Sequence, residues 1–191
     1  IHCANAILLY LLVSLTFQTP FFEKNIQRNS LIAGGTVRSF IAFFSAAIFI
    51  SHPVQTQAVT YIVQRYTSLA TMLYLAGLVL YIKARLGTRW GQPAENVKRY
   101  KLEFGWVFFY ASSLLVSVLA MKTKEIAFTL PLTVILYELS FIKKEHEKAL
   151  PYLAPFILTL LVVPLSFFDL GLREGAIVQS LDDQARASTG M

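Results

Sequence analysis

Long apolar runs, almost free of charge, constrain this chain more than any other feature of its sequence. Several of them reach or approach the roughly 20 apolar residues that a helix needs to cross a bilayer core. Only 15% of the residues are charged, against about 25% in soluble domains. A large soluble helical core would show polar faces at helical spacing, and these runs show little of that. We therefore predict an all-α, polytopic transmembrane bundle. The runs cover residues 40–50, 69–82, 104–121, 126–142 and 150–168.

About six membrane helices are expected, in one transmembrane domain over residues 1–168. Pro53 lacks an N–H and disfavours helix in the residue before it, which favours an end of the second helix at His52. The polar residues 169–191 are expected to begin a non-cytoplasmic external loop. The chain opens inside an apolar helix, so we expect a fragment whose N-terminal helices are missing. The predicted helices are 2–18, 37–51, 66–86, 103–121, 125–142 and 150–168, with a short helix at 54–64.

Basic residues alternate between the two sides of this predicted bundle. Three, six and three of the 17 lysines and arginines lie in the connections 18–38, 83–102 and 143–149. The positive-inside rule places these connections in the cytoplasm. Residues 52–65 and 122–125 then face the non-cytoplasmic side. The basic residues are not gathered on one polar domain, so we expect no nucleic-acid partner despite the formal charge of +6.

The first polar segment on that side runs from His52 to Arg65. If residues 54–64 are helical, Gln57, Tyr61 and Gln64 fall near one face. The planar guanidinium of Arg65 suits the oxygens of a phosphate at the interface, although an arginine there can also simply snorkel. His52 is interpreted either as a hydrogen-bonding group at a helix end or as the lining of a polar cavity. A metal role is not assigned, because no partner of His52 sits at metal-ligand spacing.

The second polar segment, Lys122 to Glu125, lies between two apolar runs with almost no loop. Its charges must lie at or just below the membrane surface, where charged groups are usually paired or functional. Lys124 and Glu125 could pair with each other or snorkel; alternatively, a lysine here neutralises a lipid-linked phosphate.

Other polar groups are not assigned to a binding site. Glu138 is predicted to be an interfacial or interhelical hydrogen-bonding group, and the single cysteine, Cys3, a small buried apolar residue. The sequence contains no nucleophile elbow, Walker loop, zinc motif or redox pair. A channel is disfavoured because no helix shows a repeated polar stripe.

Three stretches of the sequence resemble a known family. They are "HPVQTQAVTYIVQR", "LAMKTKEIAFTLPLTVILYEL" and the opening "IHCANAILLYLL", which places His2 and Asn5 in a His-x-x-Asn helix. Together they resemble bacterial polytopic proteins that often carry C-terminal tetratricopeptide repeats. Those proteins are similar to the animal transmembrane-and-TPR O-mannosyltransferases of the GT-C glycosyltransferase class. The resemblance covers roughly residues 1–170.

The resemblance implies a transferase of the bacterial inner membrane. It would pass a sugar from a polyprenyl-phosphate carrier to an acceptor, a protein hydroxyl, on the non-cytoplasmic side. The acidic general base of the pattern would lie upstream of this chain, so no catalytic residue is assigned and the isolated fragment is expected to be inactive. No cofactor is assigned to the chain, and the use of a divalent metal by the full-length protein is left open.

The implied site binds the lipid phosphate. Its candidate residues are Arg65, Lys124 and Lys122, with His52, Gln57 and Glu125 shaping the cavity. Gln57 stands where animal relatives tend to have Glu, which weakens an acid or metal role there. The alternative is a non-catalytic membrane scaffold or a transporter of lipid-linked envelope precursors, which explains six helices equally well.

Overall fold

The computed structural model describes residues 1–22, 35–53, 64–90, 99–142 and 150–160, and within them it contains helices and no strand. The prediction of an all-α chain is confirmed. The predicted short helix at 54–64 and the tail 169–191 fall outside these residues, apart from Gln64. The elements are α1 (His2–Thr16), α4 (Gly35–Ser51), α6 (Gln64–Trp90), α7 (Arg99–Thr123), the 3₁₀ helix η1 (Glu125–Thr129), α8 (Leu130–Tyr137), the π-helical η2 (Glu138–Ile142) and α9 (Leu150–Thr159).

Three stretches of the described chain are long and apolar enough to cross a membrane: Gln64–Gly87, Gly105–Thr123 and Glu125–Ile142. The apolar helices α1 and α4 are shorter. A membrane protein with three candidate spans is thus supported, while six crossings stay a prediction. The last of the three is not one uniform helix, since it passes from 3₁₀ through α to π geometry.

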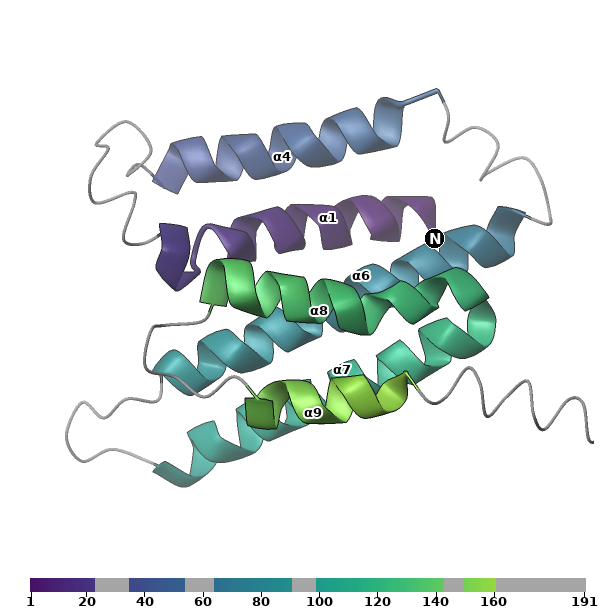
Figure 1. Ribbon diagram of the computed structural model, residues 1–191. Helices are drawn as coiled ribbons and strands as arrows, with labels where there is room; N and C mark the ends of the chain where they lie inside the picture. Colours follow the sequence, from purple (N-terminus) through teal and green to yellow (C-terminus); the bar gives the residue numbers. More distant parts are fainter. Residues whose placement is uncertain (23–34, 54–63, 91–98, 143–149, 161–191) are drawn as a thin grey trace, which may run out of the picture.

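The helices lie side by side as a bundle (Figure 1). α1 packs against both α4 and α6, and α6 makes its most extensive contact with α7. α6 and α7 approach closely at Gly77, where an added Cβ would lie 3.1 Å from Ser117 Oγ. Ser113 Oγ donates a hydrogen bond to the Gly77 carbonyl at 2.6 Å. Small residues and hydroxyl-to-carbonyl bonds of this kind are typical of helix pairs in membranes.

The outward faces of the bundle are apolar. Phe43 on α4 is 65% exposed and Leu136 on α8 is also 65% exposed, while the interior is filled by side chains such as Tyr81, Val134 and Phe156. Burying apolar surface is the main favourable term for folding in water, so such a surface suits lipid. Cys3 belongs to this outer surface and is exposed. The prediction that Cys3 is buried is therefore wrong, because in this bundle an apolar residue can face outward.

Candidate functional site

Four helix ends meet at one end of the bundle, which we call the rim. They are the start of α1, the end of α4, the start of α6 and the end of α7, seen on the right in Figure 1. His52 directly follows α4, and Arg65 is the second residue of α6. Lys124 and Glu125 follow α7. The structure thus brings these four predicted residues to the same end, whereas Gln57 lies outside the described residues.

The chain reverses at Lys124 almost without a loop, as the sequence predicted. Lys124 is extended, with φ −157° and ψ 137°, and it separates the end of α7 from the start of η1. Its N–H donates to the Ala120 carbonyl at 3.1 Å, and its own carbonyl accepts from Ala127 N–H at 3.0 Å. One residue therefore makes the turn, and both of its backbone groups are bonded. Lys122, in the last turn of α7, is exposed beside it.

Lys124 is held against α6. Its Nζ donates to Thr67 Oγ1 at 2.6 Å, and the predicted alternative of a pair with Glu125 is not seen. An ammonium carries three donors, so this bond leaves two for a ligand.

Arg65 occupies the same end but a different face of α6. Each residue turns a helix by about 100°, so the side chain of Arg65 starts about 200° around from that of Thr67. Arg65 is exposed and makes no hydrogen bond or ion pair within the part of the chain that the structure describes. Lys124 and Arg65 are therefore two separate cationic points at the rim rather than one clamp.

Two residues of α1 complete the rim. Asn5 is 2% exposed, and its Nδ2 donates to the Ser68 carbonyl at 3.2 Å. His2 Nε2 lies 3.3 Å from the Ile50 carbonyl, and the ring stacks on Phe49 with centroids 5.6 Å apart. Sequence reasoning included both residues only as a helix pattern and gave them no role. The pattern could not show that their partners lie 48 and 63 positions away.

A polar stripe runs down α6 from the rim, so the prediction that no helix carries one is wrong. Thr67, Thr71, Tyr74, Tyr81 and Arg85 recur every three to seven residues and fall on one side of the helix. Tyr74 OH hydrogen-bonds Thr133 Oγ1 and lies 3.4 Å from Thr129 Oγ1. The stripe could not be recognised in the sequence, because tyrosine is counted among the hydrophobic residues.

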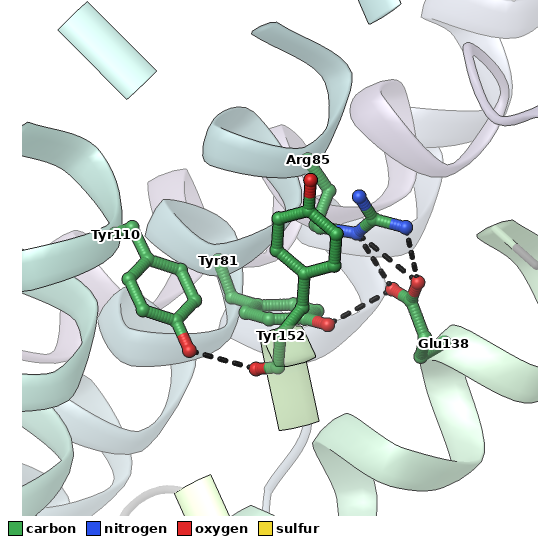
Figure 2. A network of polar contacts seen from close by, with 5 residues as sticks. All are labelled: Tyr81, Arg85, Tyr110, Glu138 and Tyr152. Carbon is green, nitrogen blue, oxygen red and sulfur yellow. Dashed lines mark hydrogen bonds and ion pairs between the residues drawn. The ribbon is translucent and has the colours of Figure 1, made fainter. Parts of the chain in front are cut away.

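The stripe ends in a buried ion pair at the opposite end of the bundle (Figure 2). Arg85 Nη2 lies 2.5 Å from Glu138 Oε1, and the two side chains are 4% and 0% exposed. Arg85 Nε also lies 3.0 Å from the same oxygen, and Tyr81 OH donates to Oε2 at 2.9 Å. Glu138 is thus an interhelical hydrogen-bonding group, as predicted. Arg85 was counted among the basic residues of the connection 83–102, and that assignment is wrong, because Arg85 lies inside α6 and is buried against Glu138.

Aromatic residues close this network, as Figure 2 shows. The Arg85 guanidinium lies 4.0 Å from the centre of the Tyr152 ring, a cation–π contact with α9. Tyr110 OH donates to the Tyr152 carbonyl at 2.7 Å. The network therefore joins α6, α7, η2 and α9. Within the described residues, no group of three or more His, Cys, Asp or Glu side chains could hold a metal ion.

Comparisons with known proteins found no counterpart: no protein-family model, no curated protein and no solved structure matches this chain.

Proposed function

We propose that the rim binds the phosphate of a polyprenyl-phosphate-linked sugar, as part of a GT-C-like membrane glycosyltransferase. The single observation that carries this proposal is the position of Lys124, a cation held against the start of α6 between two candidate membrane spans. The phosphate of a lipid carrier lies at the same level, between its apolar chain and water. A fixed cation at the end of an apolar bundle is suited to such a ligand.

The charges at the rim favour an anion. Lys124 keeps two N–H donors after its bond to Thr67, and Lys122 and Arg65 are exposed at the same end. Glu125 is the one acidic side chain of the segment 122–125. Ionised hydrogen bonds between such cations and phosphate oxygens are about twice as strong as neutral ones.

In the proposed reaction the acceptor hydroxyl attacks the anomeric carbon, and the lipid phosphate leaves. Lys124 stabilises the charge that develops on this leaving group, and Arg65 adds a second positive charge on another face of α6 at the same end of the bundle. His52, Glu125 and Gln57 shape the surroundings. The acceptor is a protein hydroxyl on the non-cytoplasmic side of a bacterial inner membrane, and a general base takes the proton of that hydroxyl.

A second candidate is transport of lipid-linked envelope precursors. The observation that favours it is the polar stripe of α6, which begins at the rim and reaches the Arg85–Glu138 pair. A transporter needs polar groups along its length, whereas a transferase needs them only at the rim. Substitutions in the middle of the stripe, at Tyr74, separate the two candidates because only transport should depend on them.

Binding of a long-chain polyprenyl phosphate to the chain in lipid nanodiscs tests the proposal. Lys124→Ala removes one charged donor, and we expect the dissociation constant to rise about tenfold. Arg65→Ala is also expected to raise the dissociation constant. Lys83→Ala is the matched control, since Lys83 is an exposed lysine that lies over the Phe109 ring, away from the rim. Equal affinities in wild type, Lys124→Ala and Arg65→Ala would remove the assignment.

A further inference from the structure

We infer that Asn5 and His2 bind hydroxyl groups of the sugar, next to the phosphate at Lys124, so that the rim selects a glycosyl phosphate over a bare lipid phosphate. This inference rests on the proposed function and names a feature of the ligand that the cations alone do not. Its basis is a pair of unpartnered acceptor atoms on α1.

The first acceptor is Asn5 Oδ1, which is buried and has no hydrogen-bond partner among the residues that the structure describes. The orientation of the amide follows from its other contact. The group facing the Ser68 carbonyl at 3.2 Å must donate, because a carbonyl only accepts, so it is Nδ2. The unpartnered atom is therefore the oxygen, and it requires a donor.

The second acceptor is His2 Nδ1, an atom that is also buried and has no partner within the described parts of the chain. Nε2 faces the Ile50 carbonyl at 3.3 Å and must carry the proton for that contact. In a neutral imidazole the other nitrogen is then an acceptor. His2 and Asn5 are three positions apart on α1, and at the rim His2 contacts the end of α4 while Asn5 contacts the start of α6.

Asn5 and Lys124 contact consecutive residues at the start of α6. Asn5 contacts Ser68, and Lys124 contacts the preceding residue, Thr67. α1, α6 and the turn after α7 thus meet within two consecutive residues of α6. A ligand held by Lys124 can present further groups to α1 without leaving the rim.

The two kinds of site demand different chemistry from one ligand. A phosphate dianion offers acceptors only, which match Lys124 but cannot satisfy Asn5 Oδ1 or His2 Nδ1. Sugar hydroxyls supply O–H donors, which match these two atoms. A site with buried acceptors discriminates against a ligand that lacks the matching hydroxyl, because the acceptors then stay unpaired. A phosphate bearing a sugar satisfies both demands.

The test compares two kinds of probe on the chain in nanodiscs: a polyprenyl phosphate, and the same lipid carrying mannose or glucose. Wild type should bind at least one glycosyl form more tightly than the bare phosphate. Asn5→Leu should reduce that preference about tenfold while leaving affinity for the bare phosphate unchanged. Gln18→Leu is the control, because Gln18 is an exposed amide just beyond the other end of α1.

A second variant keeps the test decisive if Asn5→Leu does not fold. His2→Phe keeps the ring that stacks on Phe49 and removes the acceptor, so it should also reduce the preference. An unchanged preference in the variant that folds would overturn the inference and leave the proposed function in place. Failure of wild type to bind any of the lipids would overturn both.

Discussion

Replacing Glu138 by leucine removes the carboxylate that balances a guanidinium inside the bundle. Arg85 is 4% exposed and Glu138 is 0% exposed, so neither group can exchange its partner for water without a rearrangement. The substitution also removes the acceptor of the Tyr81 hydroxyl. We expect Glu138→Leu to destabilise the folded bundle strongly.

The magnitude follows from burial. Removing one member of a buried ion pair costs about 3–5 kcal/mol, because the other charge stays uncompensated. The unpaired Tyr81 hydroxyl contributes about 1–3 kcal/mol to that loss. When Arg85 is first replaced by methionine, Glu138→Leu should cost only the contribution of the unpaired Tyr81 hydroxyl. The coupling free energy between the two positions should therefore be about 2 kcal/mol or more.

The assay is a double-mutant cycle on the free energy of unfolding, measured by titrating SDS into mixed micelles. It compares wild type, Glu138→Leu, Arg85→Met and the double variant. Glu125→Leu is the matched control, since Glu125 is an exposed glutamate, and it should stay within about 0.5 kcal/mol of wild type. The reasoning would be refuted if Glu138→Leu were as stable as the control, or if its effect were the same with and without Arg85.

Two further predictions use the same unfolding assay. Gly77→Leu should destabilise the bundle by about 1–3 kcal/mol, because even an added Cβ there lies 3.1 Å from Ser117 Oγ. Gly105→Leu is the control and should be close to neutral, because an added Cβ there meets nothing within 4 Å. Equal losses of stability in the two variants would contradict the close packing at Gly77. Tyr74→Phe should cost about 0.5–1.5 kcal/mol through its lost bonds to the threonines of η1 and α8, and an unchanged stability would count against the stripe.

Helices and their order could be predicted because the apolar runs carry almost no charge. The one-residue turn at Lys124 could be predicted for the same reason, since two such runs leave no room for a loop. The ends were less accurate: α6 extends to Trp90 and α7 begins at Arg99, beyond the expected 66–86 and 103–121. Charged residues can continue a helix past its apolar part, so hydropathy underestimates its length.

The buried ion pair could not be predicted from one sequence. Arg85 lies among loop charges in the sequence, and its partner is 53 residues away. A prediction from hydropathy places charged residues in solvent, yet a charge is tolerated within a bundle when a packed neighbour neutralises it. Only the packing of α6 against α8 and η2 shows that Glu138 is that neighbour.

The candidate site was predicted in part. Sequence reasoning selected Arg65 and Lys124, and the structure places both at the rim. The sequence could not show that Arg65 and Lys124 lie on different sides of α6. The contact of Lys124 with Thr67 depends on how α7 packs against α6. Nor could sequence reasoning find the unpartnered acceptors of His2 and Asn5, since an unsatisfied atom is a property of the packed structure.

The central claim is that two cationic points, distant in the chain, open on one side of the membrane. Single-cysteine variants test it most directly: Arg65→Cys and Lys124→Cys, each made with Cys3→Ala and treated with a membrane-impermeant maleimide in sealed vesicles of known orientation. Both cysteines should be labelled from the same, non-cytoplasmic side, with lysed vesicles showing that both thiols react. Labelling of the two positions from opposite sides would contradict the account.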